Sequence, residues 1–141
     1  MKKIFFLLLL ILIFSISCET TSPEELDKNE IIDILDSIQS NFNMNDLDGI
    51  MQYYHLDFSH NGDDYEWERN TIWFTRLNDY QNLNFENIEI TLNGNYATAS
   101  FIMHLDETST DEPSDENGDI SYFYHDLDGW KLCGNFFIVF P

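Results

Sequence analysis

The sequence contains few basic residues. Six Lys and Arg stand against 26 Asp and Glu, which gives a formal net charge of −20. Two of the six, Lys2 and Lys3, lie in the N-terminal segment. Such a chain repels nucleic acid and anionic membrane surfaces, so we expect neither as a partner. Aromatic residues make up 16% of the chain, more than a disordered acidic protein contains.

Cysteine is also scarce, and several nucleophile and phosphate motifs are missing. Cys18 and Cys133 are the only two cysteines, and two cysteines so far apart do not indicate a disulfide framework. Cys133 lies in an apolar stretch and is expected to be a buried free thiol. The sequence has no glycine-rich phosphate loop, no serine nucleophile elbow and no histidine beside Cys133. We therefore expect no cofactor.

One hydrophobic run begins the chain. Residues 4–14 are apolar, follow two lysines, and are too short to span a bilayer stably. Small residues and Cys18 come next, which resembles a bacterial lipoprotein signal; the alternative is a plain secretory peptide with an incidental cysteine. In a lipoprotein the cysteine becomes the first mature residue and carries several acyl chains, which suffice for stable anchoring.

This pattern predicts three parts: a signal peptide at 1–17, a short tether at 18–22 and a single domain at 23–141. The domain would be exported to the bacterial cell envelope and anchored in the membrane through lipidated Cys18.

The domain begins with helical periodicity and ends with strand periodicity. Ser22, Pro23 and Glu25 are typical of a helix N-terminus, and apolar residues continue at helical spacing to Phe42. Helices first and hairpins afterwards favour an α+β domain with helices on one face of a four-stranded antiparallel sheet. The elements predicted after the first helix are a helix at 47–54, a strand at 56–59, a helix from 63 or 64 to 80, strands at 88–92, 97–105, 120–125 and 130–140, and a mobile loop at 106–119.

Four segments of this order carry a resemblance to a known family: residues 48–54, 58–62, 95–99 and 128–132. Together with the element order, they resemble the nuclear transport factor 2-like (NTF2-like) superfamily, which includes polyketide cyclases and ketosteroid isomerases. The resemblance covers about residues 24–140. It implies a cone-shaped fold in which N-terminal helices pack on a curved antiparallel sheet and enclose a pocket. Enzymes of the family place acid–base groups there, whereas many members bind without chemistry, so the fold does not settle function.

A cluster of possible metal ligands lies in the middle of the chain. His55, Asp57 and His60 are all residue types that bind zinc or iron. In a strand, His55 and Asp57 share a face that His60 does not; in a helix, the first two point about 200° apart. No regular element brings the three together, so no metal site is predicted.

His60 is the central candidate for acid–base chemistry, because the resemblance places a catalytic group near the end of the first short strand. A histidine can act as a base near neutral pH. Its candidate partners are Asp57, Tyr54, Tyr122 and His125. Alternation along a strand puts His125 with Phe123 on one face and Tyr122 on the other, so only one of these sets faces the pocket. The residues expected to contact a ligand are Tyr54, His60, Trp73, Phe101 and Phe123.

Three functions stay open at this stage. The first is a lipid-anchored envelope protein whose non-enzymatic domain binds a small apolar ligand or a protein partner. The second is a lyase, isomerase or cyclase with a His-centred acid–base pair. The third is an acidic, immunity-like protein that binds a basic toxin. Because no convincing catalytic set is visible, we expect binding without catalysis. His60 and a second ionisable group in one pocket would instead favour the enzyme.

The end of the chain also predicts an oligomer. After Asn135 the last predicted strand is apolar on both faces, and such a strand needs a second cover. We therefore expect a homodimer formed through the sheet.

Overall fold

The computed structural model describes residues 22–112 and 121–135. The predicted signal peptide and Cys18 lie outside these residues, as do positions 113–119 of the predicted loop and the last predicted strand from position 136 on. The elements are, in order, α2 (Pro23–Asn43), α3 (Leu47–Met51), β1 (Ser59–His60), β2 (Asp63–Asp64), α4 (Tyr65–Trp67), the π-helix η1 (Glu68–Trp73), α5 (Phe74–Asp79), β3 (Leu83–Asn93), β4 (Tyr96–Leu105), β5 (Thr108–Glu112), β6 (Ser121–Asp126) and β7 (Gly129–Leu132).

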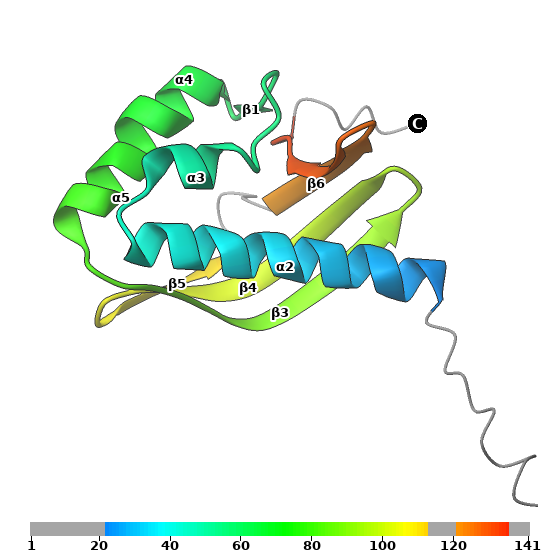
Figure 1. The fold of residues 1–141 in the computed structure, drawn as a ribbon, viewed down its shortest axis with the longest axis horizontal. Helices are drawn as coiled ribbons and strands as arrows, with labels where there is room; N and C mark the ends of the chain where they lie inside the picture. Colours follow the sequence, from blue (N-terminus) through cyan, green and yellow to red (C-terminus); the bar gives the residue numbers. More distant parts are fainter. Residues whose placement is uncertain (1–21, 113–120, 136–141) are drawn as a thin grey trace, which may run out of the picture.

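Helix α2 begins as its sequence predicts. The Ser22 hydroxyl accepts a hydrogen bond from the backbone N–H of Glu25 at 3.2 Å, and Pro23 occupies the first turn, where no N–H is needed. Figure 1 shows α2 crossing the face of the sheet. Its apolar stripe is buried there, which removes five large side chains from water: Ile31, Ile34, Leu35, Ile38 and Phe42.

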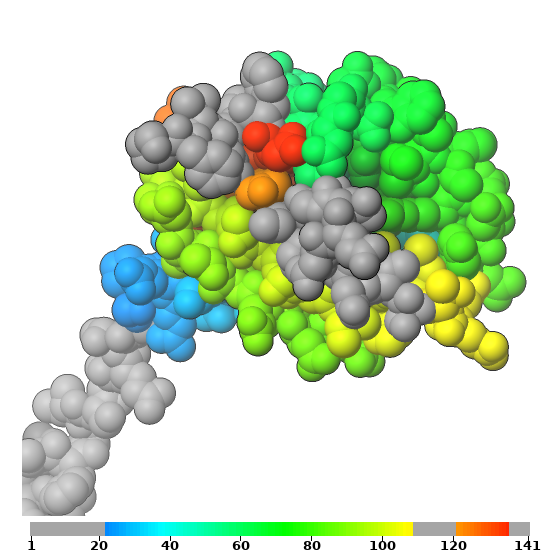
Figure 2. All heavy atoms as spheres, turned by 180° about the vertical axis from the view of Figure 1, so that it is seen from behind, coloured from blue at the N-terminus to red at the C-terminus, as the bar shows by residue number. Residues whose placement is uncertain are grey.

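The sheet is antiparallel, with the strand order β3-β4-β6-β7, and helices cover one face of it. The predicted α+β class and its curved antiparallel sheet are therefore confirmed. On the opposite side, shown in Figure 2, β3 and β4 (yellow-green) form much of the surface beside the green helices. Burial along β4 alternates strictly, and its inner face carries Ala97, Ala99, Phe101, Met103 and Leu105 as predicted.

The sheet has a fifth strand that the sequence did not predict. Thr108–Glu112 falls in the predicted loop, but it forms β5 and pairs with the second half of β4. The turn between the two strands contains Asp106, whose φ is +53°. The Asp106 carboxylate accepts hydrogen bonds from the backbone N–H groups of Gln81 and Asn82, which holds this turn against the start of β3.

A β-bulge bends β3. Its register with β4 shifts between Glu86 and Glu89, and Asn87 adopts a φ of +55°. Phe85 before the bulge and Ile88 after it both pack against the core. An extra residue in one strand increases the local bend and twist, so the bulge gives the sheet part of its curvature.

The exposed edge of β3 is covered by side chains of α2. Asn43 Oδ1 accepts a hydrogen bond from Leu83 N at 2.9 Å, and Gln39 Oε1 accepts one from Phe85 N at 3.1 Å. These bonds satisfy N–H groups that would otherwise be open to pairing with another strand. They also fix the position of α2 over the sheet.

The second helix ends earlier than predicted. It was expected to reach Tyr54, but α3 stops at Met51. The cause is tertiary: Tyr54 forms an isolated parallel bridge with Leu132, and His55 N donates to the Leu132 carbonyl at 2.8 Å. Residues 53–55 therefore run alongside β7.

The first strand is shorter and later than predicted. It was expected at 56–59, whereas β1 is Ser59–His60 and pairs with β2 in a tight hairpin. Asn61 and Gly62, an Asn-Gly pair typical of hairpin turns, both have positive φ, at +51° and +101°. Two such residues are what a type I′ hairpin turn requires.

The third predicted helix is a composite, which we call the helical rod: α4, η1 and α5 in direct succession, residues 65–79. Its start is as predicted, since Asp64 Oδ1 accepts a hydrogen bond from Trp67 N at 2.8 Å. Its middle is a π-helix, which the sequence pattern did not predict.

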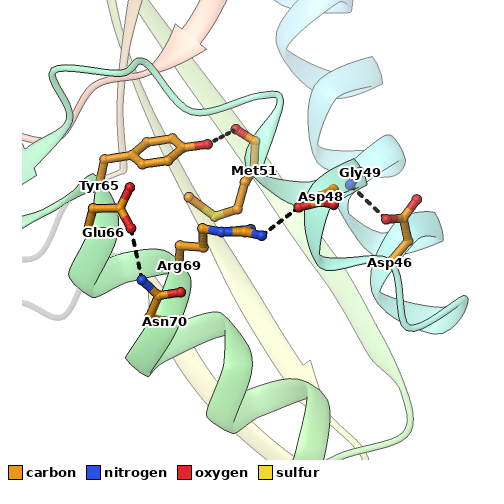
Figure 3. A network of polar contacts seen from close by, with 8 residues as sticks. All are labelled: Asp46, Asp48, Gly49, Met51, Tyr65, Glu66, Arg69 and Asn70. Carbon is orange, nitrogen blue, oxygen red and sulfur yellow. Dashed lines mark hydrogen bonds and ion pairs between the residues drawn. The ribbon is translucent and has the colours of Figure 1, made fainter.

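The helical rod is joined to α3 by polar contacts (Figure 3). Arg69 Nη2 lies 2.6 Å from Asp48 Oδ1, and the Tyr65 hydroxyl donates to the Met51 carbonyl at 3.4 Å. The Asp48 side chain is 85% exposed, so this ion pair contributes about 1 kcal/mol or less. Its main effect is to hold Arg69 of the helical rod against Asp48 of α3. Among residues 22–112 and 121–135, no helix has the length and apolar character needed to cross a membrane.

Candidate functional site

A cavity of about 200 Å³ lies between α2, the helical rod and the sheet. Most of its lining is apolar or aromatic, with α2 on one side and β3, β4 and β7 on the other. The polar and charged side chains that line it come from the β1–β2 hairpin, the helical rod, β6 and Tyr54, which follows α3. The lining residues are Leu35, Ile38, Tyr54, Phe58, His60, Asp63, Glu68, Ile72, Trp73, Arg76, Phe85, Phe101, Met103, Ser121, Tyr122, Leu132 and Gly134.

The π-helix accounts for the side chains that the helical rod turns toward the cavity. In an α-helix, Glu68 and Trp73 would point about 140° apart, because each residue turns by about 100°. Hydrogen bonds from i to i+5 widen the turn and bring residues five apart onto similar sides. Glu68 and Trp73 both line the cavity in this arrangement, together with Ile72 and Arg76 of the same rod. Single π-turns of this kind often occur at functional sites.

A chain of hydrogen bonds connects three of these groups. The Trp73 indole Nε1–H donates to the Tyr54 hydroxyl at 2.8 Å, and that hydroxyl donates to Glu68 Oε1 at 3.4 Å. Trp73 and Tyr54 are only 3% and 7% exposed, so both polar groups need these partners. Burial, followed by the nearby Glu68 charge, raises the pKa of Tyr54 well above its ordinary value. Tyr54 therefore stays a neutral donor.

Glu68 is a cavity carboxyl group whose pKa is shifted. Burial raises its pKa above the ordinary value of 4.5, and the neighbouring Asp63 charge acts in the same direction. Arg76, the hydrogen bond from Tyr54 and the nearby His60 oppose this shift. A carboxyl whose pKa is raised by burial inside a cavity is suited to exchange protons with a bound molecule.

His60 lies at the β1–β2 hairpin and lines the same cavity. Its ring lies 6.3 Å from that of Tyr122, centroid to centroid, and its Nε2 is 3.2 Å from Asn61 Nδ2. Gly134 packs directly against this hairpin: its φ is +71°, and a Cβ at this position would clash with the Ser59 carbonyl. The backbone of residue 134 thus holds His60 in the cavity wall.

The structure separates the acid–base candidates. Tyr54, His60 and Tyr122 line the cavity. Asp57 is exposed and does not line it, and His125 packs edge-on against Trp130, with ring centroids 5.1 Å apart, on the far side of the core.

The ligand-contact candidates divide in the same way. Tyr54, His60, Trp73 and Phe101 line the cavity, whereas Phe123 is fully buried in the core and is not among the lining residues. The alternation argument treated the two faces of β6 as exclusive. Near the cavity, however, β6 contributes the adjacent residues Ser121 and Tyr122.

The histidine–aspartate cluster does not gather around one point. His55 Nε2 lies 3.6 Å from Asp126 Oδ2, its ring contacts Tyr124, and His60 lines the cavity instead. Within the described residues, the only three possible metal ligands that come within 4.8 Å of one another are Asp27, Glu30 and His125.

Both carboxylates of that second group already have a structural role. Asp27 Oδ1 accepts from Trp130 Nε1 at 3.3 Å, and Glu30 Oε1 accepts from Trp130 N at 3.2 Å. These bonds attach the first turns of α2 to β7, which accounts for the position of both acids.

Two cavity residues were missed by sequence reasoning, Glu68 and Arg76. Helical periodicity places Glu68 away from Trp73, and only the π-helix brings them together. Arg76 has its guanidinium carbon 5.0 Å from the Trp73 ring centroid, a cation–π arrangement. The spacing of three between Trp73 and Arg76 is the only signal in the sequence that links them.

One smaller expectation is met. Cys133 is fully buried, and burial raises the pKa of its thiol to about 12. His104 lies on the outer face of β4, opposite the buried side chains. Its Nε2 is 3.4 Å from Glu86 Oε2, close enough for an ion pair but without hydrogen-bond alignment.

Comparison with solved structures identifies the fold. Bd1075 of Bdellovibrio bacteriovorus is similar over 80% of this chain, with a TM-score of 0.58 and 13% identity, but the match spans only 42% of Bd1075. A protein of unknown function with a cystatin-like fold from Nostoc punctiforme matches 77% of this chain and 87% of its own, with a TM-score of 0.57 and 16% identity. An NTF2-like protein of unknown function from Shewanella oneidensis matches 76% of this chain and 94% of its own, with a TM-score of 0.53 and 19% identity.

Another match is described as a candidate dehydratase of the NTF2-like family from Streptomyces avermitilis. It covers 80% of this chain and 94% of its own, with a TM-score of 0.57 and 8% identity. No protein-family model matches the sequence, and no curated protein does so at a significant level. At identities this low the likeness shows the fold alone. The chain has the NTF2-like fold, as its sequence predicted.

Proposed function

We propose that this domain binds a small, mainly apolar ligand in the cavity between α2, the helical rod and the sheet. The observation that carries the proposal is the cavity itself. Aromatic and aliphatic side chains make up most of its wall, and polar groups also line it, among them those of Tyr54, His60, Glu68 and Arg76. A mostly apolar cavity with a few convergent polar groups is the usual form of a small-molecule site.

The size of the cavity limits the ligand. An apolar cavity of about 150 Å³ holds a benzene ring, so about 200 Å³ suits a molecule of roughly ten non-hydrogen atoms. At about 0.5 kcal/mol per atom, such a ligand would bind with a Kd of about 0.2 mM. Phenylacetate and its neutral analogue 2-phenylacetamide are suitable probes of this size.

Filling the cavity should abolish binding. The core lies within residues 31–133, so a chain lacking residues 1–18 keeps it whole. In this chain Ile72→Trp places a larger side chain in the cavity wall. Ile90→Trp is the matched control, because Ile90 is half-buried on β3 and does not line the cavity. Calorimetric titration with both probes should show binding to the wild type and to the control only. Equal binding by all three proteins would place the site elsewhere.

A second candidate function is catalysis, favoured by one specific observation: His60 shares the cavity with the ionisable groups Glu68 and Tyr54. A histidine and a second ionisable group in one pocket is the arrangement that we expected of an enzyme. In such a lyase or isomerase, the Glu68 carboxylate would accept a proton from a C–H bond next to a carbonyl. A hydrogen bond from His60 or Tyr54 would then stabilise the resulting enolate oxygen.

Deuterium exchange tests this chemistry without a known substrate. Phenylacetone has the size of the probes above and carries acidic C–H bonds. In D₂O an active site of this kind would speed the loss of these proton signals, and Glu68→Gln would remove the acceleration. Glu66→Gln is the control, since Glu66 is exposed on the same rod and accepts a hydrogen bond from Asn70. Exchange at the uncatalysed rate in the wild type would leave binding as the function.

We also propose that the mature chain is held in the bacterial envelope by lipidated Cys18. The support is the order of two lysines, an apolar run and a small-residue segment before the cysteine. Several acyl chains bind a membrane stably, whereas an unmodified chain of this acidity would be repelled by anionic lipids. Cys18→Ser should move the protein from the detergent phase to the aqueous phase in Triton X-114 partitioning. Unchanged partitioning would reject the anchor.

The homodimer through the sheet remains a prediction. It is supported by the outer face of the sheet, where Tyr96 and Tyr124 pack ring to ring, 5.1 Å apart, and are both half-buried. Sedimentation velocity at increasing concentration tests it, and a strict monomer would reject it.

A further inference from the structure

Arg76 contributes a permanent positive charge to the wall of the cavity. Of the Lys and Arg in residues 22–112 and 121–135, it alone lines the cavity, and it is half-buried there. Its guanidinium is stacked over Trp73, whose own position is fixed by the hydrogen bond to Tyr54. The positive charge is thus held in place by a buried aromatic ring.

The charge of Glu68 acts on this guanidinium, but the two groups are not within ion-pair distance. Arg69, on the same helical rod, pairs with Asp48, and Lys131 donates to the Gln52 carbonyl. No described carboxylate oxygen comes within ion-pair distance of Arg76. A partly buried charge ordinarily has a partner, and this chain is rich in acids that could supply one. The missing partner points to an anion brought by the ligand.

The other ionisable groups around Arg76 come from three elements. Glu68 lies on η1, His60 on β1 and Asp63 on β2. Tyr54 and Tyr122 also line the cavity. Asp63 is exposed, so water screens its charge. Glu68 is the one carboxyl that burial moves toward its protonated form. Protonated Glu68 is a hydrogen-bond donor, which suits a ligand that carries acceptor oxygens.

We propose that the ligand of this cavity is a small apolar carboxylic acid, an inference that rests on the binding function proposed above. Its carboxylate would accept hydrogen bonds from the Arg76 guanidinium, which presents paired donors in a geometry that matches two carboxylate oxygens. Its apolar body would lie against the wall formed by Phe101, Phe85 and Met103.

A carboxylic acid fits better than other anions or a cation. A phosphate carries more charge and would face Glu68 and Asp63 in the same small space, where Arg76 is the only Lys or Arg among the described lining residues. An organic cation would be attracted by Glu68 and Asp63. The face of Trp73 that could bind it is, however, already covered by the Arg76 guanidinium, which would repel a second positive charge. A ligand with one negative charge would neutralise the charge of Arg76, and its apolar body would contact the apolar side chains of the cavity wall.

Three probes of nearly equal size separate these possibilities: phenylacetate, the neutral 2-phenylacetamide and the cationic 2-phenylethylammonium. They are titrated calorimetrically into the chain lacking residues 1–18. We expect phenylacetate to bind about tenfold more tightly than the amide, because hydrogen bonds to a charged group are stronger than neutral ones. The ammonium should bind most weakly.

Two arginine variants locate the effect. Arg76→Gln should lower the affinity for phenylacetate about tenfold and leave the affinity for the amide unchanged. Arg69→Gln removes the same charge from the same rod but outside the cavity, and it should change neither affinity. Arg76→Lys keeps the charge without the paired donors and should therefore lose less affinity than Arg76→Gln. If Arg76→Gln does not fold, Arg76→Lys still tests the role of the paired donors.

The pH dependence gives an independent readout. Ionisation of Glu68 should repel the bound carboxylate, so the affinity for phenylacetate should fall as the pH rises through the raised pKa of this group. The amide should show no such fall, and Glu68→Gln should make the phenylacetate profile flat.

The outcomes distinguish the two proposals. Equal binding of phenylacetate and the amide, lost in Ile72→Trp, would reject the carboxylic acid and keep the ligand site. Preference for the ammonium, or equal losses in Arg76→Gln and Arg69→Gln, would also reject the carboxylic acid. Absence of binding by all three probes would reject both proposals.

Discussion

Replacing Tyr54 by Phe should destabilise the domain out of proportion to the one oxygen atom that it removes. The Tyr54 hydroxyl accepts the Trp73 indole N–H at 2.8 Å, and both side chains are buried. Tyr54→Phe keeps the ring and its edge-to-face contacts with Phe58 and Trp73, at centroid distances of 5.1 and 6.4 Å. The indole N–H, however, loses its acceptor inside the protein.

The cost follows from that orphaned donor. A buried donor left without a partner costs about 1–3 kcal/mol. The bond from Tyr54 to Glu68 is long, at 3.4 Å, and adds little. For a domain of this size, the loss corresponds to a fall in Tm of roughly 4–12 °C.

Urea and thermal unfolding of the chain lacking residues 1–18 measure the effect. Tyr53→Phe is the matched control: Tyr53 is half-buried, and no hydrogen bond of its hydroxyl is seen in the described residues. It should cost less than about 0.5 kcal/mol. In a Trp73→Phe background the donor is gone, so Tyr54→Phe should cost about 1 kcal/mol less than in the wild type. Equal stability of the Tyr53 and Tyr54 variants would refute the buried hydrogen bond.

Three further predictions follow from neighbouring features. Gly134→Ala should cost roughly 2–4 kcal/mol in the free energy of unfolding, because Cβ would clash with the Ser59 carbonyl at a φ of +71°; a Tm equal to that of the wild type would contradict this packing. The Cys133 thiol, whose pKa burial raises to about 12, should resist iodoacetamide at pH 8 in the folded chain and react fully in urea, as mass spectrometry would show. The pKa of Glu68 is raised on folding, so its stability contribution is full below 4.5, the ordinary pKa, and is lost as the pH rises through the folded pKa. Glu68→Gln should therefore gain Tm relative to the wild type as the pH rises from 4 to 8, and a constant difference would argue against burial of this carboxyl.

Local signals explain why most of the fold was predictable. The cap at Ser22, the turn at Asn61 and Gly62, and the strict alternation of β4 each depend on residues close in sequence. The end of α3 was not predictable in this way. It is set by the bridge between Tyr54 and Leu132, which are distant in the chain.

The β3 bulge did leave a sequence signal that was overlooked. The apolar positions run Leu83, Phe85, Ile88 and Ile90, and the step of three after Phe85 breaks the period of two. An inward-facing series that skips a residue indicates one extra residue in the strand. Position 87 is an Asn, a residue that tolerates the positive φ found there.

The cavity was only partly predictable, because its polar groups are brought together by the π-helix. The resemblance to the NTF2-like fold led to His60, Tyr54 and Trp73. The wide helical turn that brings Glu68 near Trp73 was not predictable, because it depends on tertiary packing. The spacing of four between Glu68 and Ile72 is the one local signal for Glu68. Asp57 lies in the same short cluster as His60, yet the hairpin turns His60 to the cavity and leaves Asp57 in water.

The most direct test of the ligand site is a titration followed by nuclear magnetic resonance at the three indole N–H groups. Trp73 lines the cavity, whereas Trp67 is exposed on α4 and Trp130 bonds to Asp27 at the far end of α2. With phenylacetate, the account predicts a saturable shift of the Trp73 indole signal and no shift of the other two. Saturable shifts at Trp67 or Trp130, or an unchanged Trp73 signal at millimolar probe, would contradict it.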